Sequence, residues 1–507
     1  MATSRPNILL LMSDQHNARC TGYAGHPDAQ TPHLDQLAAQ GIAFNRAFAQ
    51  NPICTPSRVC YLSGQYPHNH GFYGLLGQEP EHLPSLFSQF RAAGYYTGAI
   101  GKIHTPYGWI EAPADVVLDA YGDEAGAGKN DFDDYLRRID PRLLADRDDT
   151  YLQEWTATGR GGQGLDARPS RLPFAHCVDH WCATEAIRVL EERPKQQPFL
   201  LWVSFPRPHE TYLPSTEFWE LYDEAQLTLP PSADEPLTGK PPNQRRTREA
   251  QRAPNSPMWL FEPRTYEAGR RRVLRGYLGC VSQVDACAGL LLEYLASAQL
   301  TEETLVVYCA DHGDFAGEHG IIEKAPGLSY DAITRVPMLW SWPGRFAAGQ
   351  RRDDLIETID VFPTLCELAE LRVPQSVDGR SLAPLLRGET VAPREAVYTE
   401  NAWSKAIRTQ RWKYVHYPPD VFPEEARPVG ELYDLERDPW EMDNLFYREE
   451  HRAVVEELRV RLLDWLVTSS RVASYMLGDG ARPHVLGEDR RVAPALLRAV
   501  RAPRNYL

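Results

Sequence analysis

The sequence predicts an α/β protein with a mixed, mainly parallel sheet flanked by helices, followed by a smaller C-terminal α+β domain. Apolar runs of strand length alternate with helical patterns along most of the chain, which is typical of a parallel sheet covered on both faces. Polar side chains follow several of these runs directly. From about residue 390 the runs become short and β-like, which favours an antiparallel sheet.

The first elements lie in the first hundred residues. Residues 8–12 are continuously apolar and predict a buried strand. Residues 31–41 predict a helix, because the segment has a threonine as cap, a proline in its first turn and a glycine at its end. Residues 83–94 repeat the helical spacing, and residues 95–100 predict the next strand.

Two further helix–strand pairs complete the larger domain. A helical pattern at residues 179–192 precedes an apolar strand at 199–205. A long helical pattern at 273–299 precedes a strand at 304–309. Because each helix is followed by a strand, the connections favour crossovers between parallel strands.

The chain divides into a large and a small part. We expect a catalytic domain at residues 1–390, which contains an irregular, proline-rich insertion at 230–263 and a flexible loop at 159–164. A small antiparallel-sheet domain is expected at 391–470, with β-like runs at 396–399, 406–408 and 412–417 and a helix at 450–467. Residues 471–507 are arginine-rich and are interpreted as a C-terminal arm.

Composition excludes several classes of function. The chain has 507 residues and a formal net charge of −15, which argues against binding to nucleic acid or to an anionic membrane. The apolar runs at the predicted strands are too short to span a bilayer, and no secretory signal is visible, so we expect a cytoplasmic location. The nine cysteines form an odd, scattered set without a CxxC pair, which predicts neither a disulfide framework nor a structural zinc site.

Four charged or ionisable residues follow predicted strands. Asp14, Lys102, His209 and Asp311 each lie just beyond the carboxyl end of an apolar run. Ligands of open α/β sheets bind at that edge. The sequence therefore predicts a functional site at this edge of the sheet.

One motif indicates the chemistry of the site. Residues 54–58 read Cys-Thr-Pro-Ser-Arg and lead into Leu-Ser-Gly at 62–64. This motif resembles the signature of the type I sulfatases, formylglycine-dependent enzymes of the alkaline phosphatase superfamily. Further segments carry the resemblance, in the same order, along nearly the whole chain: Asp14-Gln15, Gly-Lys-Ile-His at 101–104, Pro208-His209, Asp-His-Gly at 311–313, Gly-Glu-His-Gly at 317–320, Lys324, Arg-Val-Pro at 335–337 and Glu-Leu-Tyr-Asp-Leu at 431–435.

The resemblance implies an alkaline-phosphatase-like fold and the hydrolysis of sulfate esters. It implies that a formylglycine-generating maturation enzyme oxidises Cys54 to Cα-formylglycine. The hydrated aldehyde would then attack sulfur and form a covalent sulfo-enzyme intermediate. The substrate would be a small-molecule sulfate ester.

The resemblance also implies one divalent metal ion, bound by Asp14, Asp311, His312 and the modified Cys54. Calcium is the usual ion of the family, and the nitrogen ligand makes manganese a second candidate. The pairs Asp14-Gln15 and Asp311-His312 are similar to those of the choline-sulfatase and phosphonate monoester hydrolase branch. Gln15 is expected either as a weak ligand or as a hydrogen-bond partner of the formylglycine.

The resemblance also implies roles for the other residues that match the family's motifs. Arg58 would hydrogen-bond the formylglycine diol, and Lys102 and Lys324 would hold the sulfate oxygens. His104 would accept a proton from the second diol hydroxyl, so that sulfate is expelled. His209 would protonate the leaving alcohol, either alone or together with Lys324. Substrate binding is thus expected from Gln15, Lys102, His209 and Lys324.

Two alternatives stay open at this point. A phosphonate monoester hydrolase or phosphodiesterase would use the same nucleophile and metal, although the Gly-Lys-x-His segment at 101–104 favours a sulfatase. A non-catalytic protein derived from this fold is disfavoured, because the nucleophile, the cations and the metal ligands are all present. A homo-oligomer is compatible with the arginine-rich tail, and the sequence leaves the assembly undecided.

Overall fold

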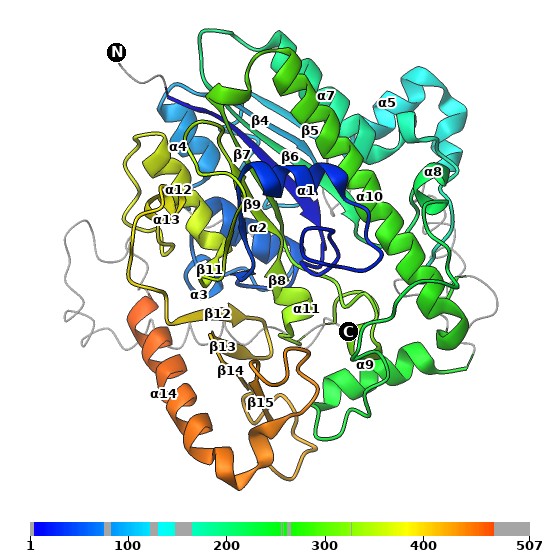
Figure 1. Cartoon of the computed structure of the whole chain (residues 1–507), viewed down its shortest axis with the longest axis vertical. Helices are drawn as coiled ribbons and strands as arrows, with labels where there is room; N and C mark the ends of the chain where they lie inside the picture. Colours follow the sequence, from blue (N-terminus) through cyan, green and yellow to red (C-terminus); the bar gives the residue numbers. More distant parts are fainter. Residues whose placement is uncertain are drawn as a thin grey trace.

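The computed structural model describes residues 5–75, 83–121, 130–147 and 165–470, except 255, 257, 261–264 and 326. An eight-stranded mixed sheet runs through the larger domain (Figure 1). Its strands, in spatial order, are β10 (Gln350–Arg352), β2 (Ile42–Phe44), β9 (Met338–Ser341), β7 (Thr304–Ala310), β1 (Asn7–Asp14), β6 (Phe199–Pro208), β4 (Tyr96–Gly101) and β5 (Val116–Asp119).

The centre of this sheet is parallel. Strand β1 pairs in parallel with β6 and β7, and β4 pairs in parallel with β6 and β5. Strand β9 runs antiparallel to β7 and to β2. All residues of β1 are buried, as expected of a strand covered on both faces. The predicted mixed, mainly parallel sheet is confirmed.

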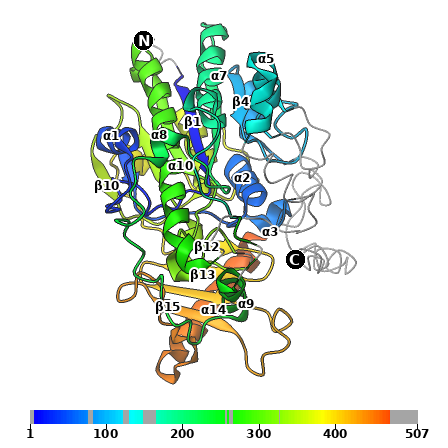
Figure 2. The same cartoon turned by 90° about the vertical axis from the view of Figure 1, so that its right-hand side faces the viewer.

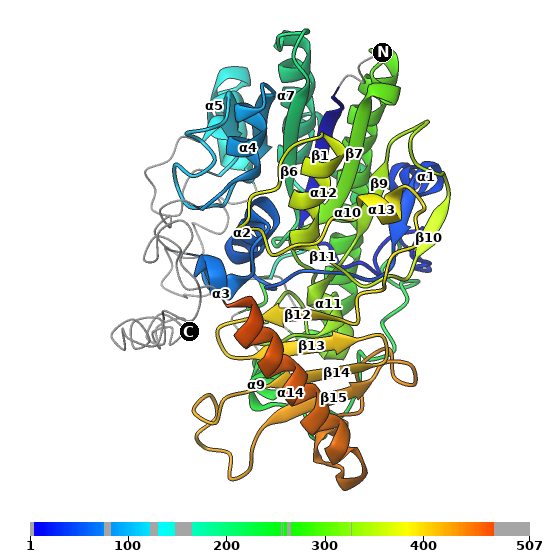
Figure 3. The same cartoon turned by 90° about the vertical axis from the view of Figure 1, so that its left-hand side faces the viewer.

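Helices cover both faces, as Figures 2 and 3 show. One face packs against α2 (Cys54–Ser63), α4 (Leu86–Ala92), α12 (Val361–Leu368) and α13 (Ala383–Leu386). The other face packs against α1 (Pro32–Gln40), α5 (Asp131–Ile139), α7 (Val178–Glu192) and α10 (Tyr266–Ser297). The short elements around this core are α3 (Pro67–His70), α8 (Thr216–Trp219), α11 (Asp331–Thr334), β3 (Ala47–Phe48), β8 (Arg335–Val336) and β11 (Ile356–Glu357).

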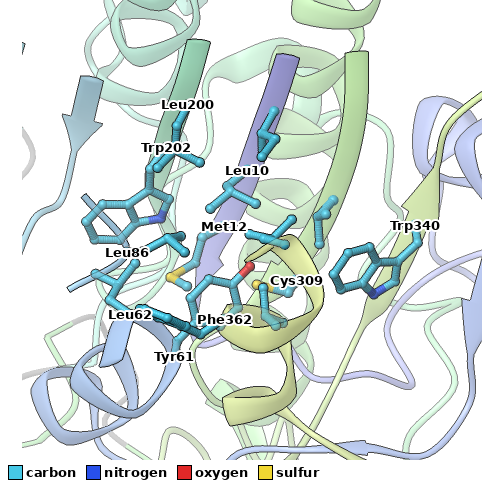
Figure 4. Close-up of a cluster of buried hydrophobic side chains, with 14 of the residues drawn as sticks. Leu10, Met12, Tyr61, Leu62, Leu86, Leu200, Trp202, Cys309, Trp340 and Phe362 are labelled. Atoms are coloured by element: carbon cyan, nitrogen blue, oxygen red, sulfur yellow. The ribbon is translucent and has the colours of Figure 1, made fainter. Parts of the chain in front are cut away.

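The core beneath α2 fixes that helix to the sheet. Leu10 and Met12 of β1 point to the α2 face, whereas Leu9 and Leu11 between them belong to the opposite core, because successive side chains of a strand alternate. Figure 4 shows Leu10 and Met12 with Tyr61 and Leu62 of α2 and Phe362 of α12. Each fully buried side chain of this size contributes about 1.5–3 kcal/mol.

The C-terminal domain is a four-stranded antiparallel sheet, β12 (Ala396–Glu400), β13 (Lys405–Thr409), β14 (Trp412–His416) and β15 (Gly430–Asp434). Helix α14 (Arg452–Ser469) packs on it (Figure 3) through Leu458, Leu462 and Trp465. The predicted smaller α+β domain is confirmed, whereas its boundaries at residues 390 and 470 stay predictions. The sequence pattern did not predict β15 as a strand.

The structure corrects the prediction for the proline-rich insertion. Helix α9 (Pro242–Arg252) occupies part of residues 230–263, which were expected to be irregular. The buried residues of α9 are proline and polar residues, including Gln244 and Gln251, so the helix has no apolar periodicity to detect. The loop at 159–164 and the arm at 471–507 lie outside the described residues.

Helix α10 begins earlier than residue 273, because the Thr265 hydroxyl caps it by accepting a hydrogen bond from the Ala268 amide. By length and composition it is the one helix among the described residues that could cross a membrane. However, 72% of its most apolar window is buried inside the protein, which is typical of a core helix.

Candidate active site

The carboxyl ends of four neighbouring strands build the site. Strands β7, β1, β6 and β4 lie side by side in this order. Asp14 ends β1, Asp311 follows β7, Lys102 follows β4 and His209 follows β6. Because these strands are parallel and adjacent, side chains that are far apart in the sequence meet at one edge.

Cys54 is the first residue of α2 and is completely buried at this edge. Its Sγ lies 3.2 Å from Nε2 of His312, 3.7 Å from Oδ1 of Asp14 and 3.9 Å from Nζ of Lys102. Burial raises the pKa of the thiol, but the positive charges of Lys102, His312 and Lys324 and a hydrogen bond from His104 lower it well below its usual value. The position at a helix N-terminus acts in the same direction.

Arg58 lies one turn further along α2 and joins the two carboxylates. Its Nε donates to Oδ2 of Asp311 at 2.9 Å, and one terminal nitrogen donates to Oδ2 of Asp14 at 3.2 Å. The other terminal nitrogen donates to the Ser204 hydroxyl at 2.7 Å and to the Lys102 carbonyl. These contacts place Arg58 behind the carboxylates, where it fixes their orientation. The predicted hydrogen bond from Arg58 to a formylglycine diol stays a prediction.

The side chains of Asp14, Cys54, Asp311 and His312 form a buried group whose ligand atoms all lie within 4.8 Å of one another. His312 Nδ1 lies 2.9 Å from the Gly313 carbonyl and donates to it, because a carbonyl only accepts. The other ring nitrogen, Nε2, faces Cys54 and Asp14. Burial lowers the pKa of His312, but Asp311 and Cys54 raise it to about 9. The group thus attracts positive charge, and its oxygen and imidazole donors fit a divalent cation.

Lys102 and His104 reach the site from the loop after β4. Lys102 Nζ lies 2.5 Å from Oδ2 of Asp14. Burial lowers the pKa of Lys102, but Asp14 and Cys54 raise it overall, so the side chain remains an ammonium. The end of β4 requires glycine at position 101, because the φ of Gly101 is +106° and a Cβ there would lie 2.0 Å from the Ser204 carbonyl oxygen.

Lys324, His209 and Gln15 form a hydrogen-bonded group within the site. Lys324 Nζ lies 2.7 Å from Oε1 of Gln15 and 3.1 Å from Nε2 of His209. His209 Nδ1 lies 2.7 Å from the Glu210 carbonyl and therefore carries the ring proton. His209 Nε2 then accepts from Lys324, so the transferable proton of this pair resides on Lys324. The side chain of Gln15 hydrogen-bonds Lys324, Glu210 and Asp314.

Three carboxyl groups near the site were not predicted. Glu210, Asp314 and Glu323 are buried around Gln15 and Lys324. Glu210 and Glu323 are sequence neighbours of His209 and Lys324, and this adjacency was the available signal.

All ten predicted site residues lie at this end of the sheet or in the loops that meet it, and their catalytic roles stay predictions.

The sequence pattern of the Sulfatase family matches residues 6–371 of the chain. The chain belongs to the sulfatase family. A second pattern, that of the C-terminal part of N-sulphoglucosamine sulphohydrolase, matches residues 317–467 of this sulfatase.

Curated relatives agree with this membership. An arylsulfatase of Clostridium perfringens is 27% identical over 480 residues, which cover 90% of this chain and 94% of the relative. A choline-sulfatase of Rhizobium meliloti is 28% identical over 459 residues, which cover 88% of this chain and 83% of the relative. The solved phosphonate monoester hydrolase of Agrobacterium radiobacter has a TM-score of 0.74 at 22% identity, over 92% of this chain and 96% of that one.

This sulfatase is a hydrolase that acts on sulfate esters, and it has the alkaline-phosphatase-like fold that the resemblance implied. The phosphonate hydrolase alternative fits less well, because the likeness to that solved structure shows the fold alone.

Proposed function

We propose that this sulfatase uses Cα-formylglycine, made from Cys54, together with one divalent metal ion held by Asp14, Asp311, His312 and residue 54. The observation that supports this most directly is the position of Cys54. Its Sγ lies at a helix N-terminus, within 3.7 Å of both Asp14 and His312. When bound, the cation would supply Lewis-acid stabilisation of negative charge on oxygen. The hydrated aldehyde would supply two hydroxyl groups at one carbon.

The cationic side chains would bind the sulfate group. Lys102 and Lys324 both lie close enough to Cys54 for their positive charges to lower the pKa of its thiol. They would hold the non-bridging oxygens of the ester, where charge must be stabilised during S–O cleavage. This arrangement collects positive charge at one site of a chain whose net charge is −15.

Protons would move through His104 and Lys324. His104 hydrogen-bonds residue 54 and would accept a proton from the hydroxyl that does not attack sulfur. Lys324 would donate a proton to the oxygen of the departing alcohol, and His209 Nε2 would orient the Lys324 ammonium by accepting a hydrogen bond from it. Gln15 would orient Lys324 through its Oε1 rather than bind the metal.

The modification is tested by mass spectrometry of the peptide that contains residue 54. Protein co-produced with a formylglycine-generating maturation enzyme should carry the aldehyde in place of the thiol and hydrolyse an aryl sulfate. Cys54→Ala should be inactive under the same conditions. An unmodified Cys54 in fully active enzyme would contradict the proposal.

The preference for sulfate is tested separately. We expect a higher kcat/KM for an aryl sulfate than for an aryl phosphonate monoester that has the same phenol as leaving group. The phosphonate monoester hydrolase is the second candidate, because Gln15 and His312 are similar to that branch. A higher kcat/KM for the phosphonate would favour it.

The metal, the location and the partners are proposals of the same kind. We expect Ca²⁺ or Mn²⁺ as the ion, and Mn²⁺ is a candidate because His312 would supply a nitrogen ligand. All nine cysteines are free thiols, which fits the proposed cytoplasmic location. A small sulfate ester and the maturation enzyme are the partners we propose, and a homo-oligomer remains compatible with the chain.

A further inference from the structure

A buried carboxyl cluster lies behind the leaving-group side of the site. It consists of Glu210, Asp314 and Glu323. Asp314 is completely buried, and the side chains of Glu210 and Glu323 are 4% and 9% exposed. None of the proton transfers proposed above uses these groups. Burying carboxyl groups is costly unless their charge is compensated, so the cluster calls for an explanation.

The cluster fixes the orientation of the Gln15 carboxamide. Gln15 Nε2 donates to Oε2 of Glu210 at 2.8 Å and to Oδ2 of Asp314 at 2.6 Å. Asp314 is itself held by the Tyr212 hydroxyl at 2.9 Å. Because both amide protons of Gln15 are used, its Oε1 must face Lys324, and it accepts from Lys324 Nζ at 2.7 Å.

The cluster also surrounds the Lys324 ammonium. Lys324 Nζ lies 3.8 Å from Oε1 of Glu210 and 3.6 Å from Oε1 of Glu323. Two of its three protons are directed to Gln15 and to His209, which leaves one N–H for a substrate oxygen.

We propose that Glu210 is a positioning residue of the sulfatase reaction. Its carboxylate holds Gln15 and keeps Lys324 charged and directed at the leaving group, while Glu323 shares a proton with it. This inference rests on the proposed roles of Lys324 and His209. Glu210 itself need not touch the substrate, because it acts through the side chains that do.

The charges around Lys324 support this role. Burial lowers the pKa of Lys324, but Glu210, then Cys54, Glu323 and Asp14, raise it well above its usual value. Burial also raises the pKa of Glu323, and the charge of Glu210 raises it further, so Glu323 is the protonated partner. For Glu210, burial raises the pKa, but the neighbouring His209 and the Lys324 ammonium lower it overall. Asp314 and Tyr212 face the same cluster.

The test uses metal-loaded enzyme that carries formylglycine, with 4-nitrophenyl sulfate and phenyl sulfate as probes. Glu210→Gln removes the charge at nearly constant shape. Without that charge the pKa of Lys324 should fall. Since Lys324 acts while protonated, the alkaline limb of the pH profile of kcat/KM should move to lower pH by about one unit. The loss of kcat/KM should be larger, about tenfold or more, for phenyl sulfate, whose leaving group depends more on a proton donor.

Controls separate positioning from a structural role. Glu217→Gln, at an exposed position of α8, should leave the pH profile and the ratio between the two substrates unchanged. Glu210→Asp keeps the charge but shortens its reach, so its alkaline limb should stay near that of wild type while its phenyl sulfate activity falls. This variant also carries the test if Glu210→Gln does not fold.

Two outcomes would overturn the inference. One is a Glu210→Gln enzyme whose alkaline limb and substrate ratio equal those of wild type. The other, if only Glu210→Asp folds, is an unchanged substrate ratio in that variant. A wild-type enzyme that contains formylglycine and metal but hydrolyses neither sulfate ester would contradict the proposed function instead.

Discussion

At the residue scale, the environment of Cys54 explains how an acidic protein can bind an anionic ester. Lys102 and Arg58 are buried beside Asp14 and Asp311, and Lys324, whose side chain is 11% exposed, lies 3.8 Å from Glu210. Each buried charge is compensated by an opposite charge nearby, which is the condition for keeping ionised groups out of water. The net charge of the whole chain therefore says little about the charge of this pocket.

His104 provides a test of the proposed second half of the reaction. His104→Ala should release about one equivalent of phenol per enzyme in a rapid burst and then nearly stop, because the group that drives sulfate expulsion is missing. Stopped-flow measurement with an aryl sulfate checks the burst. Steady turnover at the wild-type rate would exclude this role for His104.

The metal ligands provide a second prediction at this scale. Wild-type enzyme should contain about one divalent ion per chain by elemental analysis, and chelation should abolish turnover, since the proposed ligands would lose the ion that they share. His312→Ala should lose the ion on dialysis, because the imidazole Nε2 is one of the proposed ligands. Re-addition of Ca²⁺ or Mn²⁺ to chelated wild type identifies the ion. Full activity of metal-free enzyme would contradict the proposal.

The motif residues could be predicted from the sequence, whereas the side chains that orient them could not. Asp14, Lys102, His209 and Asp311 could be predicted, because each directly follows an apolar strand. The partners of Gln15 could not, because Asp314 lies 299 residues away in the sequence. No local pattern encodes a contact of that kind.

At the element scale, α2 connects the core to the chemistry. Its N-terminus carries Cys54, and its last turns insert Tyr61 and Leu62 into the core shown in Figure 4. The position of the nucleophile therefore depends on packing at the opposite end of the same helix.

This dependence gives a prediction for stability. Leu62→Ala should lower the free energy of unfolding by about 2–5 kcal/mol, because the side chain is fully buried and leaves a cavity. Urea denaturation measures the change. Leu463→Ala on α14, where the side chain is 58% exposed, is the matched control and should change it by about 0.5 kcal/mol or less. Equal effects of the two substitutions would contradict the proposed role of the α2 core.

The elements that the sequence predicted well are those with apolar periodicity. Helices α1, α4 and α7 and strands β1, β6 and β7 lie where their patterns indicated. Helix α9 was missed because its buried face is polar. Gln251 of α9 pairs both its amide nitrogen and its oxygen with the backbone of Ile322, and hydrogen bonds of this kind leave no hydrophobic pattern.

At the scale of the whole molecule, buried charges join the C-terminal sheet to the catalytic domain. Lys413 of β14 lies 3.0 Å from Asp331 of α11, and Arg408 of β13 lies 3.4 Å from the same carboxylate. Lys240 hydrogen-bonds Tyr330, Tyr433 and the Glu441 carbonyl. The two domains therefore share a polar, largely buried interface.

This interface predicts acid sensitivity. Burial raises the pKa of Asp331, but Lys413 and Arg408 lower it well below its usual value of 3.8. Asp331 therefore contributes stability that is fully present above about pH 4 and is lost as the pH falls through its lower native pKa. Asp331→Asn should be less stable than wild type at pH 7 and should show a smaller further loss below pH 4. Thermal unfolding between pH 2 and pH 7 measures both slopes, and parallel pH dependences would contradict the assignment.

The fold class, the succession of the central strands and helices, and the nucleophile motif can be predicted from the sequence alone, because they depend on local periodicity and on a contiguous pentapeptide. The residues that support the nucleophile could be identified only from their positions in space: Arg58 joins two carboxylates, Lys324 donates to His209, and Glu210 and Glu323 lie beside Lys324. The physical reason is that the parallel strands end side by side. Residues separated by hundreds of positions then lie within hydrogen-bonding distance, and their pKa values and orientations depend on that proximity rather than on sequence neighbours.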